Sequence, residues 1–217
     1  MEKKLPGVFS AQKKDGTVYY RSSITHKQKH ISLGSYDTSS KAFAAYLEAS
    51  SLILDKTLSL KDYSDHRILS FAKWVSLINY RDNGIYISTP IYLHPRYFEY
   101  ILSPDLILKF DIDDLFYYSK HKIMLRGRHF FVADYGMQVN IANRYGIKNY
   151  AVMGRDYRFV NGDPYDFRYE NIEIFNTYHG VIKKNTKKGI RYVSRIHING
   201  NYTIGTYATD TEAAIAY

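Results

Sequence analysis

The stretch Leu33-Gly34-Ser35-Tyr36-Asp37-Thr38 decides the fold, because the chain repeats it near the C-terminus as Ile204-Gly205-Thr206-Tyr207-Ala208-Thr209. Each stretch belongs to a longer pattern that opens with a Gly-Val pair, continues through Tyr-x-x-x-Ile and closes on a small-residue segment ending in Tyr. These flanking parts are Gly7-Val8, Tyr20 to Ile24 and Ala42 to Tyr46 in the first copy, and Gly180-Val181, Tyr192 to Ile196 and Ala213 to Tyr217 in the second. The shared order and spacing indicate two copies of one small module.

Each copy first alternates as a small antiparallel sheet does and then changes to helical spacing. We expect strands over 18–24 and 31–36, and over 191–198 and 202–207. Asn199-Gly200 is a strong hairpin signal, because both residues accept positive φ. Thr38 and Thr209 are expected to be helix N-caps, since a Thr hydroxyl accepts a hydrogen bond from the first turn.

The first helix should run from Ser39 to about Asp55 and should turn a small-residue face toward the sheet. That face consists of Ala42, Ala45, Tyr46 and Ala49. In the second copy the given sequence stops at Tyr217, about two turns after Thr209. We therefore expect the natural chain to extend past Tyr217.

Composition narrows the class of protein. The 217 residues fit two or three small domains, and the 23 Tyr and 11 Phe predict aromatic cores. The absence of Cys excludes disulfides, a thiol nucleophile and a thiolate zinc site. With no run of about 18 apolar residues and no N-terminal signal core, we expect a soluble, intracellular protein without membrane contact.

The net charge of +9 is unevenly distributed. Residues 1–50 hold eight Lys/Arg against four Asp/Glu, and residues 180–217 hold six against two, so each copy contributes +4. The remaining 51–179 hold 16 against 15, a net of +1. Basic modules of this kind either face phosphates or form a solubilising surface, and charge alone leaves both readings open.

The repeated pattern resembles the Apetala/ethylene-response-factor DNA-binding domain, in the divergent form found beside phage and bacterial homing-type nucleases. The resemblance implies a three-stranded sheet packed on one helix, with the other sheet face in the DNA major groove. Double-stranded DNA is therefore the expected partner. The sequence leaves open whether the chain also forms a homo-oligomer or binds a protein.

Strand alternation indicates which side chains would face DNA. Tyr20, Ser22 and Ile24, like Tyr192, Ser194 and Ile196, are expected to point inward. The predicted contacts of the first copy are Lys13, Lys14, Arg21, Ser23, Thr25, His30 and Ser32. Those of the second are Lys183, Lys184, Lys187, Lys188, Arg191, Arg195, His197, Asn201 and Thr203. Arg195 is the candidate for a guanine edge, and the lysines are candidates for phosphates.

The segment between the copies divides into several patterns. Residues 51–79 are apolar with helical spacing, and 80–110 carry prolines typical of short strands and turns. Phe110 to Tyr118 reads as a turn or short helix whose three carboxylates either bind metal or form a solvated cap. Ile123 to Asp134 reads as a hairpin.

Residues 161–172, Asn-Gly-Asp-Pro-Tyr-Asp-Phe-Arg-Tyr-Glu-Asn-Ile, resemble the second half of an HNH endonuclease motif. The matching positions are Asn161, Gly162, Asp166, Arg168, Glu170 and Asn171. An HNH motif followed directly by this DNA-binding repeat is a familiar phage arrangement. The resemblance implies a ββα core in this part of the chain.

The catalytic positions of that family do not match. Its metal-binding Asp corresponds to Arg158, its general-base His to Phe159 and its orienting Asn to Phe167, while the usual upstream His-Arg pair is Asn143-Arg144. A guanidinium repels a divalent metal, and a phenyl ring cannot accept a proton. We therefore expect no catalytic residues, metal or cofactor. Arg158 and Arg168 are added to the predicted DNA contacts, the alternative for Arg158 being a salt bridge to Asp166 or Glu170.

The sequence thus predicts an α+β protein with four parts. They are a DNA-binding module (1–56), a helical and mixed connection (57–114), a degenerate HNH-like domain (115–179) and a second, shortened DNA-binding module (180–217). The expected function is sequence-specific binding of double-stranded DNA without cleavage, as in a phage or bacterial transcriptional regulator. The alternatives are an HNH endonuclease with displaced catalytic residues, a phage inhibitor that acts through protein contacts and, ranked lower, an RNA-binding protein.

Overall fold

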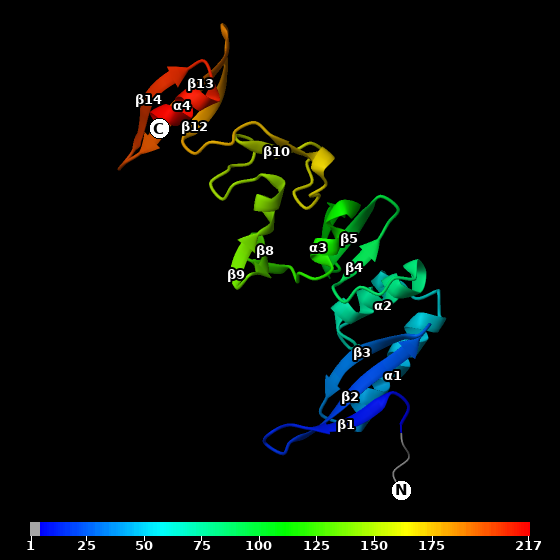
Figure 1. The fold of residues 1–217 in the computed structure, drawn as a ribbon. Coiled ribbons are helices and arrows are strands. Elements are labelled where there is room, and N and C mark those ends of the chain that lie inside the picture. Colours follow the sequence, from blue (N-terminus) through cyan, green and yellow to red (C-terminus); the bar gives the residue numbers. More distant parts are fainter. Residues whose placement is uncertain (1–4) are drawn as a thin grey trace. The chain divides into compact units, whose positions relative to one another are not determined.

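The computed structural model describes residues 5–217, which fold into two compact units (Figure 1). The first unit ends at Leu108 and also includes Ile112–Lys120, and the second consists of Lys109–Asp111 and His121–Tyr217. Small antiparallel three-stranded sheets and four α-helices make up the described chain, which confirms the α+β class.

The first unit opens with a sheet-and-helix module. Strands β1 (Val8–Gln12), β2 (Val18–His26) and β3 (Lys29–Tyr36) pair antiparallel in this order, and α1 (Ser39–Leu54) follows. Thr38 accepts a hydrogen bond from the amide of Lys41, which confirms the predicted N-cap. The turn between β2 and β3 lies between the two predicted strands, and its residues Lys27 and Gln28 both have positive φ.

The second unit ends with a module of the same topology. It contains β12 (Val181–Thr186), β13 (Gly189–His197), β14 (Asn201–Tyr207) and α4 (Asp210–Ala216). Asn199 and Gly200 have φ angles of 51° and 152°, which confirms the predicted hairpin turn. Thr209 accepts from the amide of Glu212, while the Glu212 carboxylate accepts from the Thr209 amide, so the predicted cap is a full capping box.

Both modules carry a β-bulge at corresponding places. The register shifts between Ser22 and Ser23 in the first module and between Ser194 and Arg195 in the second, which leaves one extra residue on the third strand. A bulge changes which side chains share a face and increases local twist. Simple alternation therefore describes each sheet only up to the bulge.

A glycine and a tyrosine pack together at the start of each module. Gly7 and Gly180 have φ angles of 68° and 73°, and a Cβ on either would overlap a ring, that of Tyr46 in α1 or that of Tyr217 after α4. Both the backbone conformation and the space thus require glycine. This contact explains why Gly-Val and the final Tyr occur in both copies.

A second helix extends the core of the first unit. In α2 (Phe71–Asn83), Trp74 and Leu77 join Ile24, Ile31 and Leu33 of the first sheet in one buried cluster. The 3₁₀ turn Leu60–Asp62 connects the two helices, and Trp74 Nε1 donates to Ser59 O. The small-residue face of α1 is buried, as predicted for Ala42, Ala45 and Ala49.

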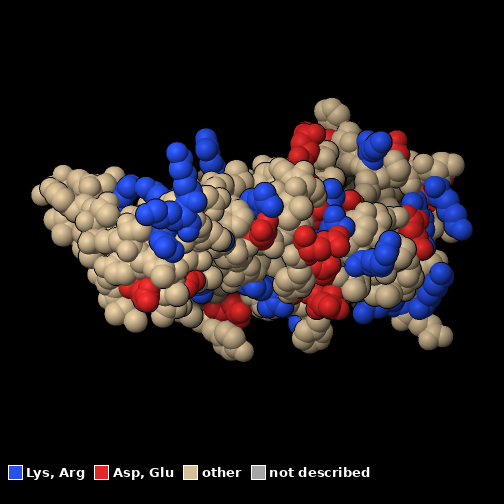
Figure 2. All heavy atoms as spheres, turned by 90° about the horizontal axis from the view of Figure 1, so that it is seen from above, with Lys and Arg blue, Asp and Glu red and all other residues tan. Residues whose placement is uncertain are grey.

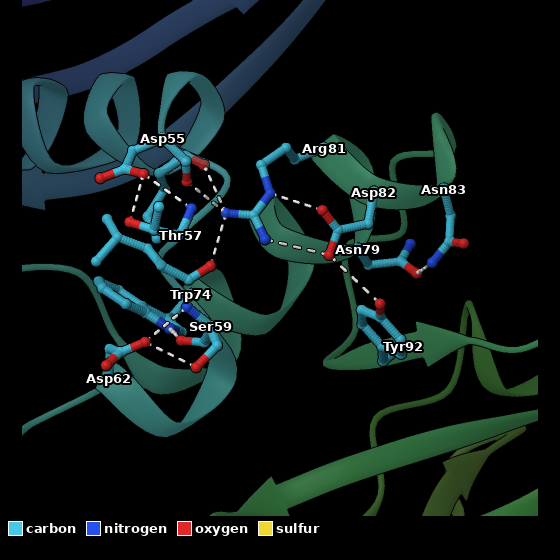
Figure 3. Close-up of polar contacts among 12 residues, drawn as sticks. Asp55, Thr57, Ser59, Asp62, Trp74, Asn79, Arg81, Asp82, Asn83 and Tyr92 are labelled. Atoms are coloured by element: carbon cyan, nitrogen blue, oxygen red, sulfur yellow. Dashed lines mark hydrogen bonds and ion pairs between the residues drawn. The ribbon is translucent and has the colours of Figure 1, made fainter.

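Arg81 ties the end of α1 to α2 (Figure 3). Its Nη1 donates to the carbonyl oxygens of Leu52, Asp55 and Leu58, at 3.2, 2.8 and 2.8 Å. Its Nε donates to Asp82 at 2.6 Å. The last carbonyl groups of a helix have no hydrogen-bond donors within the helix, and the Arg81 guanidinium provides such donors at the end of α1.

The middle of the chain is made of short elements. A sheet has the order β4 (Ile91–Leu93), β5 (Tyr97–Ser103) and β6 (Leu106–Asp111), and the 3₁₀ turn Ile112–Asp114 and α3 (Leu115–Tyr118) follow. Another sheet consists of β7 (Met124–Arg126), β8 (His129–Asp134) and β9 (Met137–Asn140), and it includes the hairpin predicted over 123–134. The 3₁₀ turn Ile141–Tyr145 comes next.

The expected ββα core is only partly present. Strands β10 (Tyr157–Phe159) and β11 (Ile172–Ile174) pair antiparallel, with the 3₁₀ turn Tyr169–Asn171 before β11. No α-helix lies between Ser119 and Thr209, a range that the structure describes throughout. The prediction of a helix in this core is wrong, because the chain after β11 is held extended: Asn176 Nδ2 donates to Asp156 and to the carbonyl of Val181 at the start of β12.

We predict that Gly7→Ala lowers the free energy of unfolding of the first unit by about 2–5 kcal/mol. The sum combines about 1–2 kcal/mol for a side chain at positive φ with about 1–3 kcal/mol for overpacking. Fluorescence of Trp74, the only tryptophan and a buried one, would follow unfolding in denaturant.

Gly84→Ala is the matched control, because Gly84 has a φ of 75° but nothing within 4 Å of an added Cβ. We expect it to cost about 1–2 kcal/mol. Equal losses for the two variants would show that the Tyr46 contact does not matter.

Candidate nucleic-acid interface

The candidate interface lies on the sheet of the C-terminal module, β12-β13-β14, which is called the second sheet below. It is the outer face of this sheet, which does not pack on α4. Register pairs Lys184 of β12 with Arg191 of β13, and it pairs Arg195 and His197 of β13 with Thr203 and Asn201 of β14. Paired residues share one face of a sheet. The register therefore places predicted contacts from all three strands on one face.

The charge of this sheet is not compensated within the protein. Lys184 lies directly opposite Arg191, an arrangement of like charges that destabilises a sheet. From Val181 to Tyr207 the sequence contains no Asp or Glu. None of the six cations of β12, β13 and their turn forms an ion pair with a residue that the structure describes; these cations are Lys183, Lys184, Lys187, Lys188, Arg191 and Arg195.

Most predicted contacts of this module are accessible. Arg191 and Arg195 are partly buried, and the following are exposed: Lys183, Lys184, Lys187, Lys188, His197, Asn201 and Thr203. Figure 2 colours the basic side chains blue and the acidic ones red, and several basic side chains stand out from the surface that it shows. The surface is suited to a polyanion.

The first module presents a less charged face. Arg21, Thr25, His30 and Ser32 are exposed, as are Lys13 and Lys14. The Thr25 hydroxyl and His30 Nδ1 are hydrogen-bonded at 3.3 Å, and Arg21 Nη2 donates to the Tyr19 hydroxyl at 2.8 Å. These side chains form a polar surface with ordered donors and acceptors.

The predicted exposure of Ser23 is wrong. Alternation placed it on the exposed face, but it is buried. It lies at the bulge, where its amide donates to the carbonyl oxygen of Gly7 at 2.9 Å. The N-terminal segment therefore covers the position that simple alternation leaves open.

The two arginines of the middle segment that were predicted DNA contacts, Arg158 and Arg168, differ in environment. Arg158 pairs with Glu173, its partner across β10 and β11, at 2.7 Å. The alternative of a salt bridge is therefore confirmed, but its partner is Glu173 in place of Asp166 or Glu170. Arg168 instead pairs with Asp166 at 2.6 Å and with Glu170 at 3.2 Å. The Arg158 side chain is exposed, whereas Arg168 is partly buried and neutralises the buried carboxylate of Asp166.

Asp166 is fully buried and anchors the loop between β10 and β11. Burial raises the pKa of this carboxyl, but hydrogen bonds from Arg168 and Asn161 outweigh burial and hold the pKa below its ordinary value of 3.8. The same pairing raises the pKa of the Arg168 guanidinium. Both groups are therefore charged at neutral pH.

Aromatic packing surrounds Phe159 and Phe167, two of the three positions that the HNH resemblance aligned with catalytic residues. Phe159 and Phe167 meet edge to face, with ring centroids 5.8 Å apart, and Phe167 also contacts Phe110, Phe130 and Tyr145. Asn171 donates from Nδ2 to the carbonyl of Asp166, while its Oδ1 accepts from the amide of Asn161. This amide side chain closes a loop.

Neither a family model, nor a curated protein, nor a solved structure matches the chain. In residues 5–217, no three His, Cys, Asp or Glu side chains gather as a metal ion would require. Across that same part of the chain, no helix combines the length and apolar character needed to cross a membrane. The site must therefore be interpreted from its own geometry.

We predict that Arg168→Met destabilises the second unit by about 3 kcal/mol, because it leaves the buried Asp166 carboxylate without its ionic partner. Arg158→Met is the control, since it breaks an exposed pair and should cost less than about 1 kcal/mol. Hydrogen exchange of peptides from 150–217 would measure the change. Similar losses in the two variants would contradict an internal role of Arg168.

We also predict that the second unit loses stability in acid. Because the pKa of folded Asp166 lies below its ordinary value, its contribution is present above pH 3.8 and is lost as pH falls through the lower folded value. Exchange rates of peptides from 156–175 should rise in that window. Asp166→Asn should flatten this part of the profile, and an unchanged profile would refute the assignment.

Proposed function

We propose that the protein binds double-stranded DNA with sequence preference and does not cleave it. The uncompensated positive charge on the second sheet carries this proposal. Lys184 opposite Arg191 weakens the free protein, and such an arrangement is favourable once an anion lies between the two cations. A polyanion that spans several strands meets this requirement better than a small ion.

The composition of the face supports duplex recognition. Lysines and arginines contact phosphates and set the orientation, whereas polar side chains read base edges. His197, Asn201 and Thr203 supply polar groups at the β13–β14 hairpin end of the sheet, next to Arg195. The major groove of B-DNA admits a small β-sheet ribbon, which makes the sheet face a suitable reader.

The first module adds a second reader of different character. Its exposed Arg21, Thr25, His30 and Ser32 include hydrogen-bond donors and acceptors but fewer charges than the second module. Two binding modules on one chain raise the effective concentration of the second module once the first has bound. We therefore infer a bipartite recognition site.

The absence of cleavage is inferred from the chemistry at the positions that the HNH resemblance identifies. Phe159 and Phe167 are buried against each other, and Asn171 uses its amide within a loop. These residues cannot activate water or hold a metal. A transcriptional regulator of phage or bacterial origin, derived from a homing-type nuclease, fits this combination, on the strength of the sequence resemblance.

The test is a selection of binding sites from random duplex DNA, with incubation of the enriched pool in Mg²⁺. We expect an enriched bipartite sequence that stays intact. A cut pool would show that the protein is an endonuclease with displaced catalytic residues. An unenriched pool would overturn sequence-selective binding.

We predict that the double substitution Lys184→Gln, Arg191→Gln lowers DNA affinity without destabilising the protein. The slope of log K against log salt concentration should fall by about 1.8, since each phosphate contact contributes about 0.9. Removal of like charges should leave unfolding unchanged or slightly improved. Lys56→Gln with Lys61→Gln removes two exposed charges outside the sheets and should change neither quantity. Equal slopes for the two double variants would contradict the interface.

A protein partner is the second candidate function, and one observation favours it. In the first unit, Phe116 is 73% exposed and borders a hollow of about 570 Å³ that is also lined by Ile85, Tyr86 and Lys29. An exposed aromatic patch of this kind is a common interaction surface. If this function is the correct one, Phe116→Ala abolishes activity in the host while Lys183→Gln with Arg195→Gln preserves it.

A further inference from the structure

The second unit contains a small pocket beside the basic sheet. Its volume is about 230 Å³, and the segment before β12 and the sheet itself form its walls. The polar lining residues are Tyr150, Arg155, His179, Arg195, His197, Asn201 and, from the end of the chain after α4, Tyr217. Pockets for drug-sized molecules occupy about 300–1,000 Å³, so this one suits a smaller group.

The lining has the chemistry of an anion site. Two arginines and two histidines contribute to it, and none of the residues around the pocket is an Asp or Glu. Guanidinium groups match the geometry of phosphate oxygens, to which they donate in pairs. A phosphate group is therefore the ligand class that the pocket would accept.

Arg195 brings an unused donor to the pocket. Its Nε is buried and has no hydrogen-bond partner among the described residues. The residue follows the bulge, and its amide donates to the carbonyl oxygen of Gly180 at 2.8 Å, which fixes the backbone there. A buried N–H without an acceptor is costly, and a bound anion would supply the acceptor.

Arg155 is held in place from one side. Its Nε and Nη2 donate to the carboxylate of Asp156, the shortest of three hydrogen bonds being 2.7 Å. Asp156 is buried and also accepts from the Val152 amide and from Asn176 Nδ2. Because these contacts fix one edge of the guanidinium, its Nη1 is preorganised for a ligand.

The two histidines are ordered as well. The ring of His179 stacks edge to face with Tyr150 at 4.9 Å and with Tyr217 at 5.2 Å. His197 Nδ1 is hydrogen-bonded to Asn201 Oδ1 at 3.2 Å. The two imidazole rings and the Arg155 guanidinium are therefore held by neighbouring side chains, and Arg195 is fixed through its backbone.

We propose that this pocket binds one backbone phosphate of the DNA, held between Arg155 and Arg195. On this assignment Arg195 contacts the backbone and does not read a guanine edge, and Arg155, which no sequence pattern indicated, becomes a binding residue. The assignment rests on the proposed function. It extends the proposed function by naming the contact that would position the second module on the duplex.

Arg195→Lys is the decisive variant, because it keeps the positive charge and removes the guanidinium donors. We expect affinity to fall about tenfold for the selected site and for unrelated duplexes alike, with unchanged sequence preference. A base reader would behave differently, since its loss relaxes preference at one base pair. Relaxed preference in the repeated selection would overturn the proposal.

Arg155→Leu tests the second side of the pocket, with Arg126→Leu as a control that removes an equal, exposed charge from the same unit and is not a predicted contact. The salt slope should fall by about 0.9 for Arg155→Leu and stay unchanged for the control. Equal slopes for the two variants would refute the site. If Arg155→Leu does not fold, Arg155→Lys and the histidine signals described next provide the test.

Imidazole proton signals of His179 and His197 would report occupancy directly in the native protein. Titrations with a short duplex, a dinucleotide phosphodiester and inorganic phosphate separate the sources of the anion. Shifts with the duplex and the phosphodiester support the proposal. Shifts with inorganic phosphate alone would identify a site for free phosphate and overturn it. Duplex binding without shifts would leave the proposed function standing and refute the pocket.

Discussion

Each sheet-and-helix module depends on the approach of a tyrosine ring to a glycine that has no side chain. Gly7 lies against Tyr46, and Gly180 lies against Tyr217, with positive φ at both glycines. The contact joins the residue before the first strand to the tyrosine in or after the helix. The glycine that opens the sequence pattern and the tyrosine that closes it are therefore needed together. This constraint explains why the repeat preserves its ends better than its surface.

The same module is used in two environments. In the first unit, α2 completes the core over the sheet, and the Tyr80 hydroxyl donates to the carbonyl of His26. Leu33 is buried there, whereas Ile204, at the corresponding bulge position of the second module, is 43% exposed. The first copy is thus part of a larger core. The second copy has a basic outer face, and the segment that contains Asp156 and Asn176 packs beside the pocket at the start of that copy.

The middle segment has a structural role that its resemblance to a nuclease motif does not convey. Arg168, Asp166 and Asn171 match that motif, yet in the structure they close and anchor one loop. Phenylalanines at the two other motif positions form part of an aromatic core. Residues that match part of a catalytic motif can therefore have a purely structural role, because buried ion pairs and closed loops use the same kinds of side chain.

The sequence by itself determined the repeat, the last two strands and the helix of each module, their N-caps and the Asn199-Gly200 turn, because local periodicity and capping encode these features. It also identified most of the basic face. Only the tertiary structure decided the bulges that bury Ser23, the pairing of Arg158 with Glu173, the missing helix after β11 and the placement of Arg155 beside Arg195. Each of these depends on contacts between segments distant in sequence, where packing overrides alternation.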